Sequence, residues 1–249
     1  MTDELGAQLS QVALWCVLCT VLFGASLQFG TPSVLTERKD RWYWASCVVG
    51  SLHAGYTSIM AVWVLASGTV PMWDRFGAPA PSWEYVVQVS LGFYIYDTVL
   101  TLCSPSLPGK AALLFHHFLA IVNHFYPVCV HHQFAAISAG GYLSELSTPL
   151  VNARWMLEKA GGGGSTMAYT INGVLMMVVF FLCRLVVQAA VLYQIYVSVP
   201  SAAPPLLSDL GLFGHFVGAS AIAFYFLNTF WMSKMVKGAI KLFTKPKKG

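Results

Sequence analysis

Two adjacent histidines, His116 and His117, stand in a hydrophobic stretch of the sequence that is long enough to cross a membrane. Ionisable side chains are costly in hydrocarbon, so those that occur there usually face the interior of a helix bundle and mark a site. Other ionisable residues stand in neighbouring hydrophobic stretches, namely His53, Asp97 and Glu145. The sequence therefore predicts a polar site inside a membrane domain.

Asp97 and the histidine pair have the residue types that general-base chemistry uses. A carboxylate beside an imidazole holds the ring in one tautomer and stabilises its charged form. A short loop joins their two spans, so we expect antiparallel neighbours. With the α-helical rise, Asp97 and the pair lie about 6–8 Å from the midpoints of their spans, toward the same end. We therefore expect His116, His117 and Asp97 to be catalytic. A simple contact between helices, or a salt bridge from Asp97 to Arg184, is the alternative.

The polar residues of the fourth hydrophobic stretch gather on one side of the predicted helix. At about 100° per residue, one arc of about a third of the circumference holds the histidine pair, Asn123 and His124. The other positions are apolar and suit contact with lipid. They are Phe118, Leu119, Ile121, Val122 and Phe125. Hydrogen bonds between helices are the alternative explanation of this polar arc, above all for His124.

The fifth hydrophobic stretch places Glu145, Thr148 and Asn152 on one face at helical spacing. Pro149 predicts a bend in the same helix. Together with the polar arc, these residues suggest the lining of a lipid pocket. The residues expected to bind substrate are His53, Asn123, His124, Glu145, Thr148 and Asn152.

Glu145 needs a partner, because an isolated charge at membrane depth is strongly disfavoured. Arg184 is the one basic residue deep inside a predicted span. With the α-helical rise, however, the two residues lie about 10 Å apart along the helix axes. The sequence therefore predicts that Glu145 faces the interior and that His116 or His117 is its nearer partner.

The composition predicts an all-α integral membrane protein. Of the 249 residues, 57% are hydrophobic and only 10% are charged, and the mean hydropathy is +0.64. The first hydrophobic stretch is not expected to be a cleaved signal peptide, because Asp3 and Glu4 stand where such peptides are basic. Seven stretches are candidates for transmembrane helices: 7–29, 43–67, 83–103, 112–130, 133–153, 168–198 and 210–232. The sixth is long, and we expect it to leave the bilayer near 193–199.

Basic residues favour the cytosolic side of a membrane. Seven spans put twelve of the 14 Lys and Arg residues on the side of the C-terminus, and only Arg75 on the other. We therefore expect a cytosolic C-terminus. The formal net charge of +4 comes mainly from the tail, so it predicts contact with membrane lipids rather than with nucleic acid. Lys245–Gly249 fits the Lys-x-Lys-x-x pattern for retrieval to the endoplasmic reticulum. The sequence does not indicate an oligomeric state.

The seven histidines raise the alternative of a metal-dependent membrane hydrolase or oxygenase. The spacing argues against it, because HxxxH and HxxHH patterns do not occur and His131–His132 is predicted on the opposite side of the membrane from the pair. Cys16 and Cys19 have CxxC spacing, but they lie on one face of the first predicted helix and are expected to be packing thiols, and the six cysteines predict no secreted disulfide framework. We expect neither a metal ion nor a bound cofactor.

Several segments together resemble the TLC-domain family of membrane proteins, especially its short members of the type numbered 4. They are Ser46, His53, Gly92–Asp97, Phe115–Phe118, Glu145–Trp155 and Ile171–Phe181. The resemblance implies a six-helix membrane barrel preceded by one extra helix. The corresponding divisions are 1–39 for the first helix and a cytosolic linker, 40–240 for the TLC domain and 241–249 for a basic cytosolic tail.

The resemblance also implies kinship with ceramide synthases, which join an acyl-CoA to a sphingoid amine with an adjacent histidine pair. That role falls on His116 and His117, with acyl-CoA as a co-substrate. Ceramide synthases carry a His-Asp dipeptide in the next span, where this chain has Ser144–Glu145. Two functions therefore stay open. One is a lipid acyltransferase that uses the histidine pair as base or transient acyl carrier; the other is a non-catalytic protein that binds or traffics membrane lipids.

Overall fold

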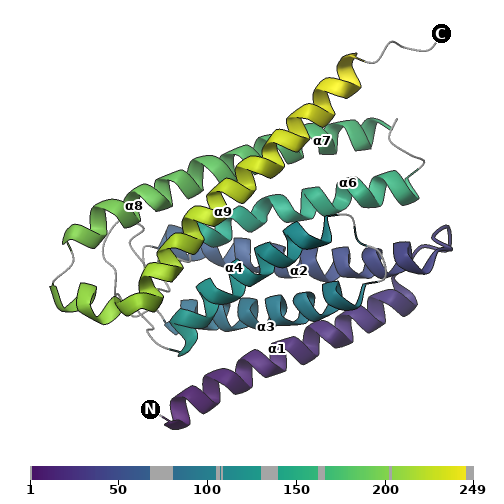
Figure 1. Ribbon diagram of the computed structural model, residues 1–249. Coiled ribbons are helices and arrows are strands. Elements are labelled where there is room, and N and C mark those ends of the chain that lie inside the picture. Colours follow the sequence, from purple (N-terminus) through teal and green to yellow (C-terminus); the bar gives the residue numbers. More distant parts are fainter. Residues whose placement is uncertain are drawn as a thin grey trace.

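Helices make up almost all of the chain that the structure, a computed structural model, describes (Figure 1). The described residues are 2–67, 81–104, 107, 109–129, 140–161, 166–201 and 204–244. Within these ranges no residue forms a strand, as the all-α prediction requires. The elements are α1 (Thr2–Phe29), α2 (Arg38–Ser67), α3 (Pro81–Cys103), α4 (Lys110–Cys129), η2 (Leu143–Ser147), α6 (Thr148–Ala160), α7 (Met167–Phe181), η3 (Leu182–Val186), α8 (Val187–Ser201) and α9 (Pro204–Thr244).

Four helices in the described chain are long and apolar enough to cross a membrane. They comprise Glu4–Phe29, Arg38–Val64, Trp83–Cys103 and Met167–Tyr193. They match four of the predicted spans, and the sixth predicted span corresponds to α7, η3 and α8, which continue to Ser201. The other predicted spans fall in α4, in η2 with α6, and in α9, so the described helices agree with a count of seven. This pattern fits a multi-pass membrane protein.

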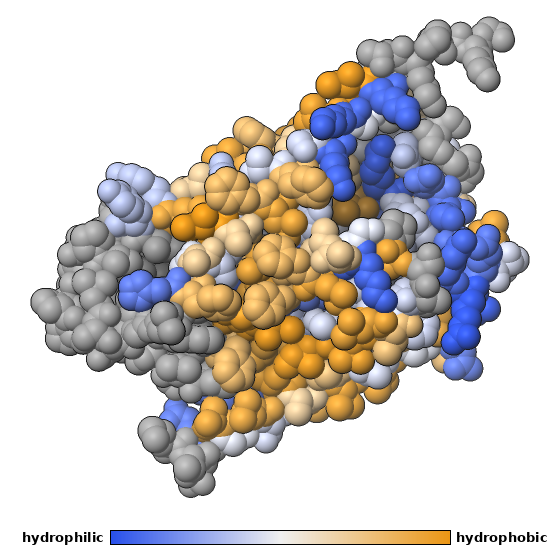
Figure 2. All heavy atoms as spheres, in the orientation of Figure 1, coloured by the Kyte–Doolittle hydropathy of each residue, from blue (hydrophilic) through white to orange (hydrophobic). Residues whose placement is uncertain are grey.

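Hydrophobic and hydrophilic side chains occupy different zones of the surface. Figure 2 shows hydrophobic residues over the middle of the displayed face and hydrophilic residues gathered toward the end where α7 begins and α6 ends. We call this the basic end, because four lysines or arginines stand at helix ends there: Arg38 in α2, Lys110 in α4, Lys159 in α6 and Lys241 in α9. The N-terminus lies at the other end (Figure 1).

Helix contacts follow one another around the molecule. Helix α2 packs against α3, α3 against α4, α4 against α9, α9 against α7 and α8, α7 against α6, and α6 against α2. Helix α1 lies outside this circuit and packs on α3 and α2 (Figure 1). Gly92 allows the close approach of α1 to α3, because a Cβ at this position would lie only 2.6 Å from the carbonyl oxygen of Val12.

Helix α3 is the most buried of the four candidate spans. Its apolar side chains face α1, α2 and α4 at the same time, so the helix reads as apolar nearly all round. The buried residues that α3 supplies to the core are Trp83, Val86, Val87, Leu91, Phe93, Tyr94 and Tyr96. This packing fixes the helix that carries Asp97.

The short turn from α3 to α4 is held by Lys110. Its Nζ donates to the carbonyl oxygens of Leu102 at 2.9 Å and Ser104 at 3.3 Å, which lack partners inside the helix. The two helices therefore pack as antiparallel neighbours, as predicted, and Asp97 of α3 lies opposite the histidine pair of α4.

Two irregular turns interrupt the helices next to the predicted site. Residues 140–142 are helical, Leu143–Ser147 forms a 3₁₀ turn, and α6 begins directly after it. Pro149 stands in the first turn of α6, where a proline costs no backbone hydrogen bond, so the irregular turn precedes the proline instead of following from it. Leu182–Val186 forms a π-helical turn between α7 and α8.

Candidate functional site

Asp97 and His117 form the pair that the sequence predicts. Nε2 of His117 lies 3.1 Å from Oδ2 of Asp97. Asp97 therefore pairs with a histidine and not with Arg184. In the neutral ring, Nε2 carries the hydrogen that the carboxylate accepts, so the lone pair is on Nδ1. This Nδ1 is buried and has no hydrogen-bond partner in the part of the chain that the structure describes. A carboxylate that orients an imidazole in this way is the arrangement that general bases use.

His116 lies beside this pair, with its ring centroid 5.8 Å from that of His117. Aromatic rings enclose it on other sides: Phe224 at 5.1 Å, Trp231 at 5.5 Å and Tyr94 at 6.1 Å. Its Nδ1 is also buried, and none of the described groups forms a hydrogen bond with it. Two imidazoles with unpaired ring nitrogens thus stand together on one side of α4.

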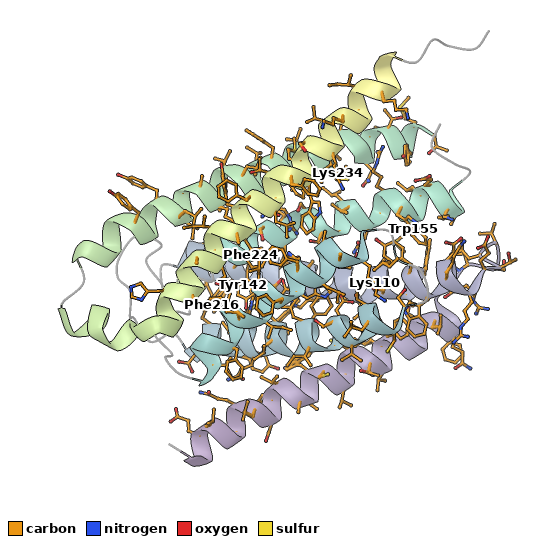
Figure 3. All side chains as sticks on the ribbon, viewed as in Figure 1. Lys110, Tyr142, Trp155, Phe216, Phe224 and Lys234 are labelled. Carbon is orange, nitrogen blue, oxygen red and sulfur yellow. The ribbon has the colours of Figure 1, made fainter. Side chains whose placement is uncertain are left out.

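The three residues predicted to be catalytic line one cavity of about 370 Å³, here called the large cavity. Thr148 and Asn152, which the sequence predicts as substrate-binding, line it too. The other residues of its wall are Tyr43, Ser46, Cys47, Gly50, Phe93, Tyr94, Leu113, Glu145, Val151, Phe180, Arg184, Trp231, Lys234 and Met235. Figure 3 shows Lys234 in the half of the molecule that holds Lys110 and Trp155, so the large cavity extends toward the basic end.

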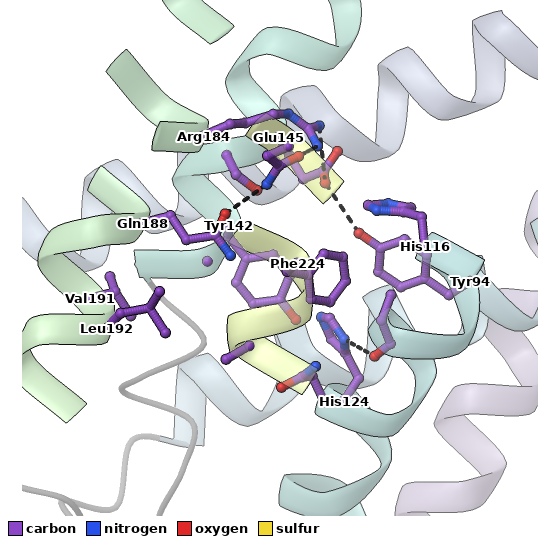
Figure 4. A pocket seen from close by; sticks show the side chains of 16 residues that line it. Tyr94, His116, His124, Tyr142, Glu145, Arg184, Gln188, Val191, Leu192 and Phe224 are labelled. Carbon is purple, nitrogen blue, oxygen red and sulfur yellow. Dashed lines mark hydrogen bonds and ion pairs between the residues drawn. The ribbon is translucent and has the colours of Figure 1, made fainter. Parts of the chain in front are cut away.

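A smaller cavity of about 130 Å³, here called the small cavity, lies on the other side of His116. Asn123 and His124 line it, as do Tyr142, Gln188 and Phe224 (Figure 4). The two cavities share Tyr94, His116, Glu145 and Arg184, which therefore form the boundary between them. In Figure 3, Tyr142 and Phe224 lie farther from the basic end than Lys234 does.

Glu145 is buried at this boundary with three partners. Nη2 of Arg184 lies 3.6 Å from Oε1 of Glu145. Tyr94 donates its hydroxyl hydrogen to the same Oε1 at 3.3 Å, and Thr148 donates to Oε2 at 2.8 Å. One opposite charge and two hydroxyl groups thus compensate the carboxylate, as burial of a charge requires. The prediction that Glu145 faces the interior is confirmed, because it lines both cavities.

Arg184 is the charged partner of Glu145, which corrects the prediction of a nearer histidine. The axial separation of about 10 Å assumes straight α-helices, which rise about 1.5 Å per residue. Glu145 instead lies in the 3₁₀ turn, where the rise is about 2 Å per residue, and Arg184 lies in the π turn. The two irregular turns change the position and direction of both side chains, and the long side chains of Glu145 and Arg184 close the rest of the distance.

Arg184 is held by neutral groups as well. Its Nε donates to Oγ of Ser147 and its Nη2 to Oγ1 of Thr148, both at 2.8 Å. Its Nη1 reaches Oδ1 of Asn228 at 3.4 Å, and Asn228 in turn donates to Gln188 at 2.7 Å. Helices α6, α8 and α9 therefore meet around one guanidinium group, which fixes the boundary between the cavities.

The remaining predicted substrate-binding residues have defined partners. Asn123 donates to Leu119 at 2.8 Å and to Ser220 of α9 at 2.6 Å. Asn152 donates to Cys47 at 3.1 Å and to Ser51 at 3.0 Å, both in α2. These two amides line cavities and also join helices, so both the functional and the structural explanations apply to them.

His53 lies outside both cavity linings. Its Nε2 is 3.1 Å from Oγ of Ser90, and its ring stacks on Phe93 with 3.9 Å between the centroids. These contacts join α2 to α3 behind the site. The structure thus assigns His53 a packing position, although the sequence predicts it as substrate-binding.

The polar arc of α4 is confirmed for the four polar residues that the sequence predicts there, since His116 and His117 line the large cavity and Asn123 and His124 the small one. Phe118 and Phe125 are exposed, as their predicted contact with lipid requires. Leu119 is buried instead, which corrects its predicted place on the lipid side, because α3 and α9 cover more of α4 than one arc.

Four residues of the site carry no clear signal in the sequence. Tyr94, Trp231, Gln188 and Asn228 stand among many aromatic or amide residues and have no distinctive spacing. Asn228 was recognisable only as an amide in an apolar stretch, which usually marks a contact between helices or a site.

The sequence that forms this site matches a known family. Residues 43–237 match the family model of the TLC domain. The chain belongs to the TLC-domain family. This membership confirms the resemblance based on the histidine pair and the segments around it, and it places the chain among membrane proteins. All the described residues of both cavities fall within the matched range.

Individual relatives cover most of this TLC-domain chain. It is 29% identical to TLC domain-containing protein 4-B of Danio rerio over 211 residues, which are 83% of this chain and 77% of the relative. It is 27% identical to TLC domain-containing protein 4 of Homo sapiens over 227 residues, 88% of this chain and 82% of the relative. It is also 27% identical to TLC domain-containing protein 1 of Mus musculus over 188 residues, 74% of this chain and 71% of the relative.

Proposed function

We propose that this chain transfers an acyl group from a thioester, such as acyl-CoA, to the amine or hydroxyl group of a membrane lipid. One observation carries the proposal. The imidazole of His117 is paired with the carboxylate of Asp97 at 3.1 Å, next to His116, in the wall of the large cavity.

The chemistry needs a base that takes a proton from the attacking group. Nδ1 of His117 carries a lone pair once Nε2 donates to Asp97, and it is the proposed base. The amine or hydroxyl of the lipid attacks the thioester carbonyl and gives its proton to Nδ1. The carbon–sulfur bond then breaks, and the leaving thiolate recovers that proton from the imidazolium. Asp97 stabilises the imidazolium between the two steps.

His116 is the proposed second member of the pair. Its buried and unpaired Nδ1 suits either a hydrogen bond to the carbonyl oxygen or a transient acyl bond, within the part of the site that the structure describes. Arg184 lines the same cavity, so a positive charge that can stabilise the negative charge of the transition state is near.

The shape of the large cavity suits these substrates. Lys234 lines it near the basic end and is exposed, so a water-soluble thioester has a route in from that side. The basic end is the proposed cytosolic end, where acyl-CoA is found. The order of helix contacts from α2 to α9 supports a six-helix barrel with α1 outside, and the Lys-x-Lys-x-x pattern supports the endoplasmic reticulum as the location.

A second candidate is a protein that binds or traffics a membrane lipid without catalysis. One observation favours it: at the position of the His-Asp dipeptide of ceramide synthases, this chain has Glu145 in an ion pair with Arg184. A carboxylate that is held in an ion pair between two helices stabilises their packing and does not take part in proton transfer.

Untargeted lipidomics separates the two candidates. Cells that express the wild type are compared with cells that express the His116→Ala/His117→Ala double variant at equal protein level. The matched control is His215→Ala, an exposed histidine of α9. Acyl transfer predicts one class of acylated lipid that rises with the wild type and with the control but not with the double variant. Identical lipid profiles for all three would overturn acyl transfer.

A further inference from the structure

The small cavity contains a hydrogen-bond acceptor without a partner. Nδ1 of His124 lies 2.6 Å from the carbonyl oxygen of Ala120. A carbonyl oxygen has no hydrogen to give, so Nδ1 carries the hydrogen and the neutral ring has its lone pair on Nε2. This Nε2 is buried, and no hydrogen-bond donor for it exists among the residues that the structure describes.

The ring of His124 is held in this orientation. Tyr94 packs against it with 5.1 Å between the centroids and Tyr142 with 5.3 Å, and the residue is only 9% exposed. The imidazole therefore cannot turn toward solvent to satisfy Nε2. Burial of an acceptor without a donor is unfavourable, so a ligand that brings a donor gains affinity here.

The rest of the small cavity is suited to a hydrocarbon chain. Val191, Leu192, Ala221 and Phe224 supply apolar wall. Figure 4 shows Phe224 of this wall between Tyr142 and Tyr94, with His124 close by. A mostly apolar wall with a few well-placed polar groups is typical of sites that bind lipids and other small molecules.

The position of His124 defines where along a chain the donor must lie. His124 follows His116 by eight residues in α4, which places it about 12 Å farther along the helix. The proposed function puts the carbonyl carbon of an acyl group at His116. A donor about 12 Å away from that carbon then lies in the middle of a long acyl chain.

We propose that the small cavity binds a hydroxyl group in the middle of a lipid acyl chain, and that this hydroxyl donates to Nε2 of His124. The inference rests on the proposed function for the position of the acyl carbonyl. It names the class of acyl chain that this protein prefers, namely a chain with a mid-chain hydroxyl.

Binding of three thioesters to the purified full chain in detergent tests the inference. They are stearoyl-CoA, stearoyl-CoA with a hydroxyl in mid-chain, and stearoyl-CoA with a hydroxyl beside the carbonyl. We expect the mid-chain hydroxyl to raise affinity about tenfold, the effect of one hydrogen bond in a buried site, and the other hydroxyl to raise it little. Equal affinity for all three would overturn the inference. It would mean that no hydroxyl of the acyl chain donates a hydrogen bond to Nε2 of His124.

Two variants test whether the gain in affinity depends on Nε2 of His124. His124→Phe keeps a ring of similar size and removes the acceptor. The affinity for the mid-chain hydroxyl thioester, divided by the affinity for unsubstituted stearoyl-CoA, should therefore fall to about one. His215→Phe, which replaces an exposed histidine of α9, should keep the wild-type ratio. A tenfold ratio that persists in His124→Phe would contradict the inference.

The outcome is separate from that of the proposed function. The wild-type ratio is measured without turnover and without any variant that risks misfolding. If the wild type shows the tenfold preference but releases no CoA, acyl transfer fails and the binding site stands. If CoA is released and the acyl group appears in lipid, but the three thioesters bind with equal affinity, acyl transfer stands and the hydroxyl site fails.

Discussion

The two cavities that meet at His116 differ in what holds their imidazoles. In the large cavity, the carboxylate of Asp97 accepts the hydrogen of His117. In the small cavity, the uncharged carbonyl oxygen of Ala120 accepts that of His124. Only a carboxylate strongly stabilises an imidazolium, so only the large cavity has the pairing that proton transfer uses. The same residue type thus acquires different chemistry from the charge of one partner.

The ion pair at the boundary between the cavities has a mainly structural role. Glu145 and Arg184 hold each other there, and their further partners are hydroxyl and amide groups. A buried ion pair of this kind is weak support for stability, but loss of one member leaves an uncompensated charge. We therefore expect substitutions in this ion pair to lower stability, and substitutions in the His117–Asp97 pair to lower turnover.

The largest expected effect is on turnover in the large cavity. Asp97→Asn keeps the size and hydrogen bonding of the side chain and removes the charge that stabilises an imidazolium on His117. We expect acyl transfer to fall at least about a hundredfold, the usual contribution of a positioned general base. Expression, membrane insertion and thermal unfolding should stay as in the wild type. Full activity in Asp97→Asn would make this carboxylate a packing residue.

The next effect is on stability at the boundary. Arg184→Gln leaves the carboxylate of Glu145 buried without its charged partner, and should lower the free energy of unfolding by about 3–5 kcal/mol. Glu145→Gln added to that variant removes the uncompensated charge and should recover much of the loss. Unfolding of the detergent-purified proteins measures both. A double variant as unstable as Arg184→Gln alone would show that the ion pair is not the cause.

A smaller effect is expected at His53, the histidine behind the site. His53→Phe keeps the stack on Phe93 and loses one hydrogen bond to Ser90, which should cost about 1 kcal/mol. Turnover should not change, because His53 lies outside both cavity linings. A large loss of turnover in a folded His53→Phe protein would mean that a residue of α2 also takes part in catalysis.

The smallest effect is expected at the surface of the basic end. Lys159 and Asp40 form an ion pair at 2.8 Å, and the lysine side chain is 37% exposed. Because exposed pairs contribute about 0–1 kcal/mol, Lys159→Gln should change the free energy of unfolding by less than that. Turnover should equal that of the wild type. A change as large as that of Arg184→Gln would mean that the contact between α2 and α6 depends on this pair.

Much of the large cavity follows from sequence, because spacing within a helix carries it. A rise of about 1.5 Å per residue and a short connecting turn place Asp97 opposite the histidine pair, and the structure joins Asp97 and His117. The polar arc of α4 follows from helical periodicity in the same way. Both predictions involve regular α-helices, for which the register is known from the sequence.

The boundary does not follow from sequence in the same way. Glu145 and Arg184 lie in a 3₁₀ turn and a π turn, and neither turn has a reliable sequence signal. Pro149 indicates an irregular helix but not the residues at which the helix departs from α geometry. His53 differs again, since its partner Ser90 lies on another helix and depends on the rotation of α2 against α3. Contacts between helices are set by packing, which a single sequence does not show.

Release of CoA by the purified protein tests the central claim most directly. The wild type and Asp97→Asn are reconstituted into lipid vesicles of mixed acceptor lipids with radiolabelled acyl-CoA, and free thiol and labelled lipid are measured together. We predict that the wild type releases one thiol for each acyl group that appears in lipid, and that Asp97→Asn binds acyl-CoA but releases at least about a hundredfold less. A wild type that binds acyl-CoA without releasing thiol, or a variant that releases as much, would contradict acyl transfer by the His117–Asp97 pair.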